Sequence, residues 1–434
     1  MAEILPLKAW RYHPRYTDSL EKLTSPLFDV VSPTQLDLLY SNPINSIHFT
    51  LPHKDHTVQK TSSLLKNWKD QGVIIQDQLP GIYVYYQYFR LPGSSKEHCR
   101  KGFVIHIRAY DWDERQILRH EDTIAHSVKE RVNLLNATEI QSSPTHGLYE
   151  DTSFLLEAYM DESIKKPIYD LKDYQGVREV LSVITDTSII ARFISFMKDK
   201  KIILADGHHR LQAAIYYKHQ CAKVNKNHNG NEGYNYHMMY LTNSRSNNLK
   251  ILPTHRLVKK LGISRETVLD KSKKYFDIEI IYDTDEIDPM NLQQKWSFIL
   301  IFRDKAYLIS LKENKINEYN SAFPEVVKNL DLSVLHYFFV DKVLGIPFRK
   351  QRFDENLLYE KNLLRCQHKV AGQEVDLAII TREILMEEVM AVCHSGHTLP
   401  QKSTYFYPKA LSGLLFGSIN SEEFNYPYSK YFNP

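Results

Sequence analysis

Glycine and cysteine are scarce in this sequence, which has 15 glycines and four cysteines among its 434 residues. The low glycine content, beside 28 tyrosines, argues against a flexible or repetitive chain. The cysteines are widely separated and form no CxxC pair, which argues against a disulfide scaffold and a cysteine-based zinc site. We therefore expect reduced thiols that pack as small hydrophobic side chains: Cys99, Cys221, Cys366 and Cys393.

Charge of one sign and long hydrophobic runs are also lacking. The chain has 55 basic and 52 acidic residues, a formal net charge of +3, so no global field draws it to nucleic acid or to a membrane. No apolar run reaches membrane length, and the first residues show no signal pattern. We expect a cytoplasmic protein whose partner is a small molecule, in an oligomeric state that the composition leaves open.

Three widespread catalytic motifs are missing as well. The sequence contains no P-loop of the form GxxxxGK[ST], no GxGxxG after a strand and no GxSxG elbow. A nucleotide or polyphosphate bound by this chain must therefore occupy an atypical site.

The most informative stretch present is residues 201–217, KIILADGHHRLQAAIYY. A short apolar run ends at Asp206, Gly207 interrupts it, and apolar residues then recur at helical spacing. The pattern predicts a buried strand that delivers Asp206, Gly207, His208, His209 and Arg210 to a tight turn at a helix N-terminus. The unpaired N–H groups and the dipole favour an anion there, and the guanidinium of Arg210 suits phosphate or carboxylate. A helix start whose histidines only cap and solvate is the structural alternative.

The segments around this turn predict the fold class. Residues 179–218 are typical of strand–helix–strand–helix, a βαβ-type core with the site at a carboxyl strand end. The length favours two or three domains, and we predict a mixed α/β or α+β chain with residues 1–220 and 221–434 as its two parts. Strands are predicted at 28–33, 42–52, 81–89, 102–112, twice within 143–160, and at 236–243, 278–282, 297–303 and 306–311. Helices are predicted at 56–71, 127–139, 265–275 and 332–344, and a strand–helix pair at 375–392.

Other polar segments are candidates for the same site. Residues 116–123, QILRHEDT, place ionisable side chains together, and a predicted helix with basic residues follows. A late loop, residues 399–419, combines lysines and hydroxyls with two prolines and two glycines, a composition typical of an ordered surface loop or of a loop folded over a phosphate. We predict substrate contacts from His48, His120, Thr123, Lys129, Arg131, Ser403 and Thr404, and further phosphate contacts from Lys402 and Lys409.

The motifs LADGHHRLQAA, HEDT…KERVNLLNAT, FDVVSP, NPINSIHF, ILPTHRL and LPQKSTYFYPK, in this arrangement, resemble the family catalogued as domain of unknown function number 1015. The resemblance extends over nearly the whole chain. The DGHHR turn also resembles the signature of the ParB/sulfiredoxin-like superfamily, which includes free-serine kinases. That resemblance implies a ParB/serine-kinase-like α/β core in which residues 206–210 hold phosphates and help to place magnesium.

Phosphoryl transfer needs donors for phosphate oxygens, a magnesium ion on carboxylates and a base for the attacking hydroxyl. Asp206 is the predicted magnesium ligand, and Glu121, then Asp29, are the predicted bases. Asp206 and His209 complete the predicted catalytic set. The leading hypothesis is a kinase of a free hydroxyl compound such as L-serine, with a nucleotide or pyrophosphate as donor.

Two other classes of function stay open. One is a ParB-like nucleotide-binding or DNA-associated module without catalysis. The other is a metal-dependent hydrolase that uses His120, His208 and His209, although no HExxH-type spacing supports it.

Overall fold

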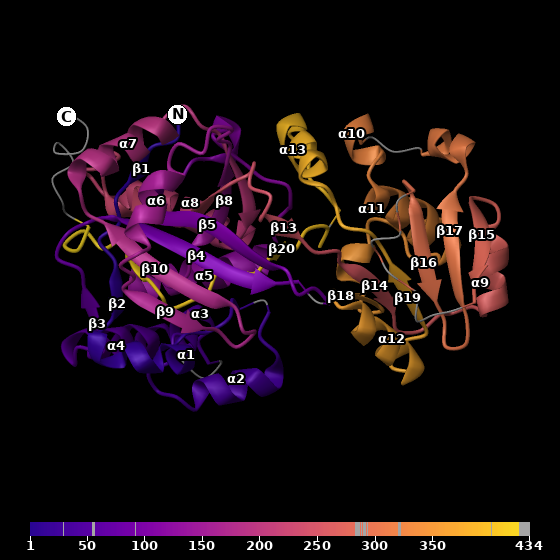
Figure 1. Cartoon of the computed structure of the whole chain (residues 1–434), viewed down its shortest axis with the longest axis horizontal. Coiled ribbons are helices and arrows are strands. Elements are labelled where there is room, and N and C mark those ends of the chain that lie inside the picture. The colour runs from indigo at the N-terminus through magenta and orange to yellow at the C-terminus, as the bar shows by residue number, and fades with distance from the viewer. Residues whose placement is uncertain are drawn as a thin grey trace. The chain divides into compact units, whose positions relative to one another are not determined.

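The structure, a computed structural model, describes residues 1–424 apart from residues 29, 54–56, 92, 283–286, 288, 290, 291, 293, 320–322 and 401. The chain folds into two compact units (Figure 1). The N-terminal unit contains residues 1–119, 123–249 and the described residues from 408 on, and the C-terminal unit contains residues 120–122 and 250–407. The predicted mixed α/β fold is confirmed.

The two units do not divide the chain at the predicted boundary near residue 220. Strand β12 (Tyr236–Asn243) lies beyond that point, yet it pairs with two strands inside the N-terminal sheet. The last part of the chain returns to the same unit, where Trp10 and Phe416 exchange backbone hydrogen bonds. Long-range strand pairing therefore sets the division.

The N-terminal unit is built on a mixed nine-stranded sheet with the order β6-β11-β8-β12-β5-β4-β10-β9, in which β1 also pairs with β5. Its other strands are β1 (Ile4–Leu5), β4 (Ile82–Arg90), β5 (Glu97–Arg108), β6 (Ile117–Leu118), β8 (Thr145–Tyr149), β9 (Tyr169–Lys172), β10 (Arg178–Ile184) and β11 (Ile202–Asp206). Two-stranded pairings join β2 (Trp10–Tyr12) to β3 (Ile74–Gln76) and β7 (Ile140–Gln141) to β21 (Gly417–Ser418).

Helices cover both faces of this sheet (Figure 1). Alternate residues of β4 point to opposite faces, so Ile82 and Val84 enter one core and Tyr83 and Tyr85 the other. The first core includes side chains of α6 (Glu157–Ser163), α7 (Thr187–Met197) and α8 (His208–Val224). The second includes side chains of α1 (Leu20–Leu23), α3 (Ile47–Thr50) and α4 (Val58–Asp70). The remaining helices of this unit are α2 (Pro33–Tyr40) and α5 (Ala125–Thr138).

The C-terminal unit is built on an antiparallel six-stranded sheet with the order β15-β17-β16-β19-β14-β18. Its strands are β14 (His255–Val258), β15 (Phe276–Ile281), β16 (Ser297–Ile301), β17 (Ala306–Leu311), β18 (Leu357–Glu360) and β19 (Leu377–Ile380), and β13 (Lys250–Ile251) pairs separately with β20 (Phe406–Tyr407). The helices are α9 (Arg265–Ser272), α10 (Glu325–Lys328), α11 (Asp331–Val334), the π-helix η6 (Leu335–Val343), α12 (Leu363–Ala371) and α13 (Met386–Ser395).

Three local predictions are wrong. Residues 42–52 are not a strand but contain helix α3, because Asn45 turns the chain: its amide nitrogen donates to the Lys22 and Thr24 carbonyls and its oxygen accepts from the Ile47 N–H. The described residues of 28–33 form no strand, although Ser32 does begin a helix. The second strand predicted within 143–160 is helix α6.

The predicted strand–helix–strand–helix order of residues 179–218 is confirmed, but its strands are not neighbours. Four strands lie between β10 and β11 in the sheet, so the arrangement is not a compact βαβ unit. The strands predicted at 81–89 and 102–112 are confirmed as β4 and β5, which pair as an antiparallel hairpin. In the part of the chain that the structure describes, no helix combines the length and the apolar character that crossing a membrane requires.

Candidate functional site

The turn between β11 and α8 has the geometry that the sequence predicts. Asp206 is the last residue of β11, Gly207 stands at the N-cap, and α8 begins at His208. Gly207 has φ +91°, and a Cβ at this position would lie 2.5 Å from Cγ2 of Thr145. Only glycine therefore satisfies both the backbone conformation and the available space.

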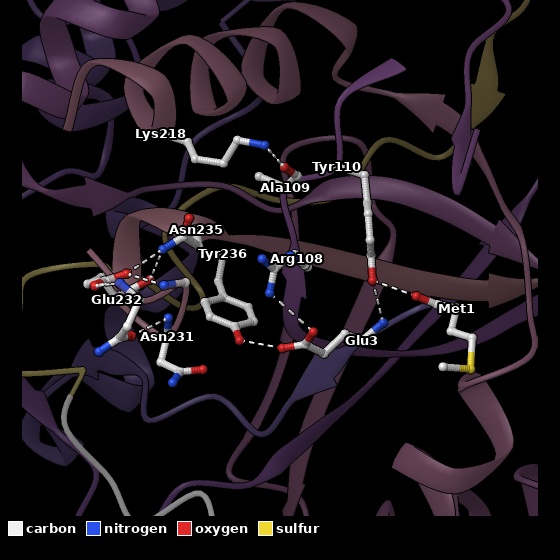
Figure 2. A network of polar contacts seen from close by, with 12 residues as sticks. Met1, Glu3, Arg108, Ala109, Tyr110, Lys218, Asn231, Glu232, Asn235 and Tyr236 are labelled. Carbon is white, nitrogen blue, oxygen red and sulfur yellow. Dashed lines mark hydrogen bonds and ion pairs between the residues drawn. The ribbon is translucent and has the colours of Figure 1, made fainter. Parts of the chain in front are cut away.

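The start of α8 lacks the usual compensation for its positive end. No side chain caps the helix, and its first turn contains no acidic residue. Because the first N–H groups of a helix have no intrahelical partner, such an end favours an anion. The helix itself is fixed farther along, where Lys218 Nζ donates to the Ala109 carbonyl at 2.7 Å (Figure 2).

The contact to Ala109 belongs to a network that ties α8 to the sheet. Arg108, the last residue of β5, donates to Glu3 Oε2 at 3.3 Å, and the Tyr236 hydroxyl also donates to Glu3 (Figure 2). The Tyr110 hydroxyl donates to the Met1 carbonyl at 2.6 Å. These bonds join β1, β5 and β12 to the helix that carries the candidate site.

Asp206 is held between two cations. Its Oδ1 contacts Lys409 Nζ, and its Oδ2 accepts from Arg210 Nη2 at 2.8 Å. The three side chains are only 10–13% exposed. Burial by itself raises the pKa of Asp206, but Lys409 and Arg210 outweigh burial and hold this pKa well below its usual range. Asp206 is therefore a permanent carboxylate and a weak base.

Lys409 is brought to Asp206 by a buried polar network on β4, β5 and β10. Gln87 Nε2 donates to the Lys409 carbonyl at 3.1 Å, and Arg100 donates to the Pro408 carbonyl. Glu179 accepts from Gln87 Nε2 at 3.1 Å and from the Tyr85 hydroxyl at 2.7 Å. Burial, reinforced by the charge of nearby Asp173, raises the pKa of Glu179 to about 8.

The other residues of the turn have distinct surroundings. Arg210 Nη1 donates to the Ser143 hydroxyl at 2.9 Å and to the Pro144 carbonyl at 2.6 Å, so its guanidinium links the turn to the segment before β8. His209 Nε2 accepts from the Ile124 N–H at 2.9 Å, and His208 is buried. This turn therefore brings Lys409 and His209 to the start of α8.

Four further predicted residues lie elsewhere in the N-terminal unit. The guanidinium of Arg131 is 4.4 Å from the Phe28 ring centroid and donates to the Thr50 carbonyl. His48 Nε2 lies 3.0 Å from the Asn42 carbonyl oxygen. Thr123 is half-buried, Lys129 is exposed on α5, and Asp29 lies outside the described residues. The substrate contacts predicted for these side chains stay predictions.

The remaining predicted residues belong to the C-terminal unit. His120 is buried, and its Nε2 lies 2.8 Å from the Thr404 hydroxyl, so the structure brings these two predicted residues together. Ser403 is buried and donates to the Pro400 carbonyl at 2.5 Å. Glu121 lines a cavity in this unit, and Lys402 is exposed with φ +57°.

Sequence reasoning missed the residues that position Lys409: Gln87, Arg100, Glu179 and Tyr85. In the sequence, Gln87, Arg100 and Glu179 are recognisable as charged or amide side chains within strands that are otherwise apolar and rich in tyrosine. The structure also bears on the magnesium role predicted for Asp206. Both oxygens of this carboxylate already bind cationic side chains, so the residue as it lies does not fit a magnesium ligand. We derive no step through a metal.

Comparison with known proteins places the chain in a family. The family profile described as "Protein of unknown function (DUF1015)" matches residues 4–333. The chain belongs to this family. No curated protein matches it. The resemblance inferred from the sequence motifs is thus confirmed.

The solved structures that match this family member include three that share 11–13% sequence identity with it. A conserved hypothetical protein from Pyrococcus furiosus has a TM-score of 0.35, with 70% of this chain and 89% of that chain covered. A free serine kinase in complex with AMP has a TM-score of 0.38 and 12% identity, with 74% of this chain and 93% of that chain covered. C-terminally truncated SbnI from Staphylococcus aureus has a TM-score of 0.34 and 11% identity, with 71% of this chain and 85% of that chain covered.

Proposed function

We propose that this protein binds a phosphate group at the start of α8 and transfers a phosphoryl group to a small hydroxyl compound such as L-serine. The proposal rests on one arrangement: Lys409 and Arg210 gathered on Asp206 beside an uncapped helix start. Two cations around one carboxylate leave an excess positive charge, and the helix N-terminus adds to it. This combination suits the oxygens of a nucleotide or pyrophosphate donor.

Phosphoryl transfer requires mainly positioning and charge stabilisation. The acceptor hydroxyl oxygen forms a bond to phosphorus, the bond from phosphorus to the leaving oxygen of the donor breaks, and the hydroxyl proton passes to a base. Asp206 is too weakly basic for that role at neutral pH, and its function is to hold the two cations in place. Glu121, the base predicted from the sequence, belongs to the C-terminal unit, and its role stays a prediction.

The test is the formation of O-phosphoserine. Purified full-length protein is incubated with L-serine and with ATP, ADP or pyrophosphate, with and without magnesium, and the product is measured by mass spectrometry. We expect product with at least one donor, and a rate about 100-fold lower in Lys409→Met and in His209→Ala, because each removes a group aimed at developing charge. Glu121→Gln tests the assigned base in the same assay.

The control is Asp199→Asn, a change at an exposed aspartate of the same unit. This variant should retain the full rate, and circular dichroism should show that every variant is folded. Absence of O-phosphoserine with all three donors refutes the proposed reaction. If the nucleotides still raise the melting temperature of the wild type but not that of Lys409→Met, the turn is a binding site without catalysis. Full rates in both Lys409→Met and His209→Ala would show that the turn is not the site.

A further inference from the structure

The C-terminal unit contains a cavity of about 960 Å³, whose lining residues take no part in the proposed reaction apart from Glu121, the predicted base. Its volume lies in the range of small-molecule sites, about 300–1,000 Å³. The described residues that line it come from the π-helix η6, from the segments on either side of that helix, and from residues 121–122 and 398–400. All of these belong to the same unit.

Aromatic rings form much of the wall. Tyr319 and Tyr337 are stacked, with ring centroids 4.2 Å apart and planes at 28°. Phe323 and Phe348 form a second, tilted pair with centroids 5.7 Å apart. Tyr319 is buried, whereas Tyr337, Phe323 and Phe348 are half-buried and line the cavity. Half-buried rings of this kind offer faces on which a planar ligand ring can stack.

Cationic side chains lie among these rings. Arg352 Nη2 donates to the Asp122 carbonyl at 3.0 Å, while its buried Nε has no hydrogen-bond partner among the described residues. Arg349 is exposed and forms no ion pair with any residue that the structure describes. Lys342 lies 5.0 Å from the Tyr337 ring centroid. Arginine forks of this kind match carboxylate and phosphate oxygens.

The carboxylates of the wall are Asp341, Asp122 and Glu121. Asp341 accepts from the Phe348 N–H at 3.1 Å and lies 3.6 Å from Lys342. Asp122 accepts from the Thr398 hydroxyl at 3.2 Å. Asp341 is thus paired with Lys342, whereas Arg349 and Arg352 form no ion pair with any residue that the structure describes.

The cavity is also lined by an unusual backbone element, the π-helix η6. Residues Leu335–Val343 form nine residues of π-helix, in which the Leu344 N–H bonds to the Phe339 carbonyl at 2.9 Å. π-Helices are rare, usually span a single turn, and occur frequently at functional sites. Next to this helix, Ser333 adds a buried hydroxyl to the wall of the cavity.

We propose that this cavity is a second binding site, for a small molecule that combines a planar ring with an anionic group. The ring stacks on the half-buried aromatic side chains, above all Tyr337. The anion, a phosphate or a carboxylate, binds Arg352 and Arg349. The site is built from residues of the C-terminal unit, and its occupation does not depend on phosphoryl transfer.

Calorimetric titration of the full-length protein tests the site, with AMP as the ring phosphate and phenylpyruvate as the ring carboxylate. We expect saturable binding of at least one probe. Arg352→Ala and Tyr337→Leu should each weaken it at least about tenfold, and Arg352→Lys should weaken it less than alanine does, because it keeps the charge but loses the fork. Arg265→Ala is the matched control, an arginine of the same unit that pairs with Asp304 outside the cavity.

The outcomes separate this site from the proposed reaction. Binding that persists in His209→Ala but weakens in Arg352→Ala and Tyr337→Leu supports the cavity, whether or not O-phosphoserine is formed. Selective binding of AMP or of phenylpyruvate identifies the anion as phosphate or carboxylate. Two results would overturn the proposal: neither probe saturates at millimolar concentration, or binding is lost in His209→Ala while both cavity variants retain it.

Discussion

Replacement of Asp206 by asparagine should destabilise the N-terminal unit strongly. The carboxylate is 13% exposed and binds Lys409 and Arg210, which are 11% and 10% exposed. Asparagine has nearly the same shape but no charge, and its NH2 group must face a donor of one of the two cations. The substitution therefore leaves two poorly solvated cations without their counter-charge.

The magnitude follows from this burial. Two unit charges about 4 Å apart attract by ~4 kcal/mol at an effective dielectric constant of about 20. Removing one partner of a buried pair costs about 3–5 kcal/mol. Because the side chains retain slight exposure, we expect Asp206→Asn to lower the free energy of unfolding by about 3 kcal/mol. The matched surface pair, Asp170 with Arg178, is 39% and 50% exposed, and Asp170→Asn should cost less than about 1 kcal/mol.

The assay is a double-mutant cycle in urea, followed by circular dichroism. Asp206→Asn and Lys409→Met are measured singly and together. The double variant should lose about 2 kcal/mol less than the sum of the single losses, because it no longer buries an unpaired lysine. A loss below about 1 kcal/mol in Asp206→Asn, or additive effects in the double variant, would refute the reasoning.

The same residue predicts a pH effect with a definite sign. The pKa of Asp206 is lower in the folded state than in the unfolded state, where an aspartate titrates near about 3.9. Its contribution to stability is therefore complete above about pH 4 and is lost as the pH falls further. Wild-type protein should lose stability between about pH 4 and pH 2 more steeply than Asp206→Asn. Parallel curves over this range would contradict the ion-pair assignment.

Three further changes test the surroundings of the site. Gly207→Ala should lower the free energy of unfolding by more than about 1 kcal/mol, measured in urea, because of the positive φ and the collision with Thr145. Burial raises the pKa of Glu179 from its ordinary value of 4.5 to about 8 in the folded protein. The wild-type melting temperature should therefore fall as the pH rises from 4.5 to 8, and Glu179→Gln should flatten that curve. Asn45→Ala should lower the free energy of unfolding by about 2 kcal/mol in urea, because the Thr24 carbonyl and the Ile47 N–H lose their side-chain partner. An effect near zero would contradict the role of Asn45 in the turn.

The turn at Asp206 could be predicted because its determinants are local. An apolar run, a glycine and a helical repeat lie within 17 consecutive residues, and each acts on the backbone next to it. The strand predicted around Ile47 was wrong for the opposite reason. Its apolar residues alternate as in a strand, but hydrogen bonds from Asn45 to the C-terminal end of α1 decide its conformation, and all four helical residues are buried.

Only the tertiary structure shows which residues come together at the candidate site. Lys409 could be named from the sequence as a phosphate contact, but not as the partner of Asp206, from which it is separated by 203 residues. Glu179 looked like any charged residue within a strand. Its complete burial depends on a sheet that places β10 beside β4, and on a return of the chain that delivers Lys409 to the same place.

The sequence alone thus determined the strand, the glycine and the helix start that present Asp206, because short-range sterics and periodicity specify them. It also determined the family. The tertiary structure decided that Lys409 joins Arg210 as a cationic partner of Asp206, and which strands bury the network around Lys409. It also decided that a cavity opens beside a π-helix in the C-terminal unit. These features arise from contacts between residues far apart in the chain, whose encounter depends on the packing of the whole unit and leaves no local pattern to detect.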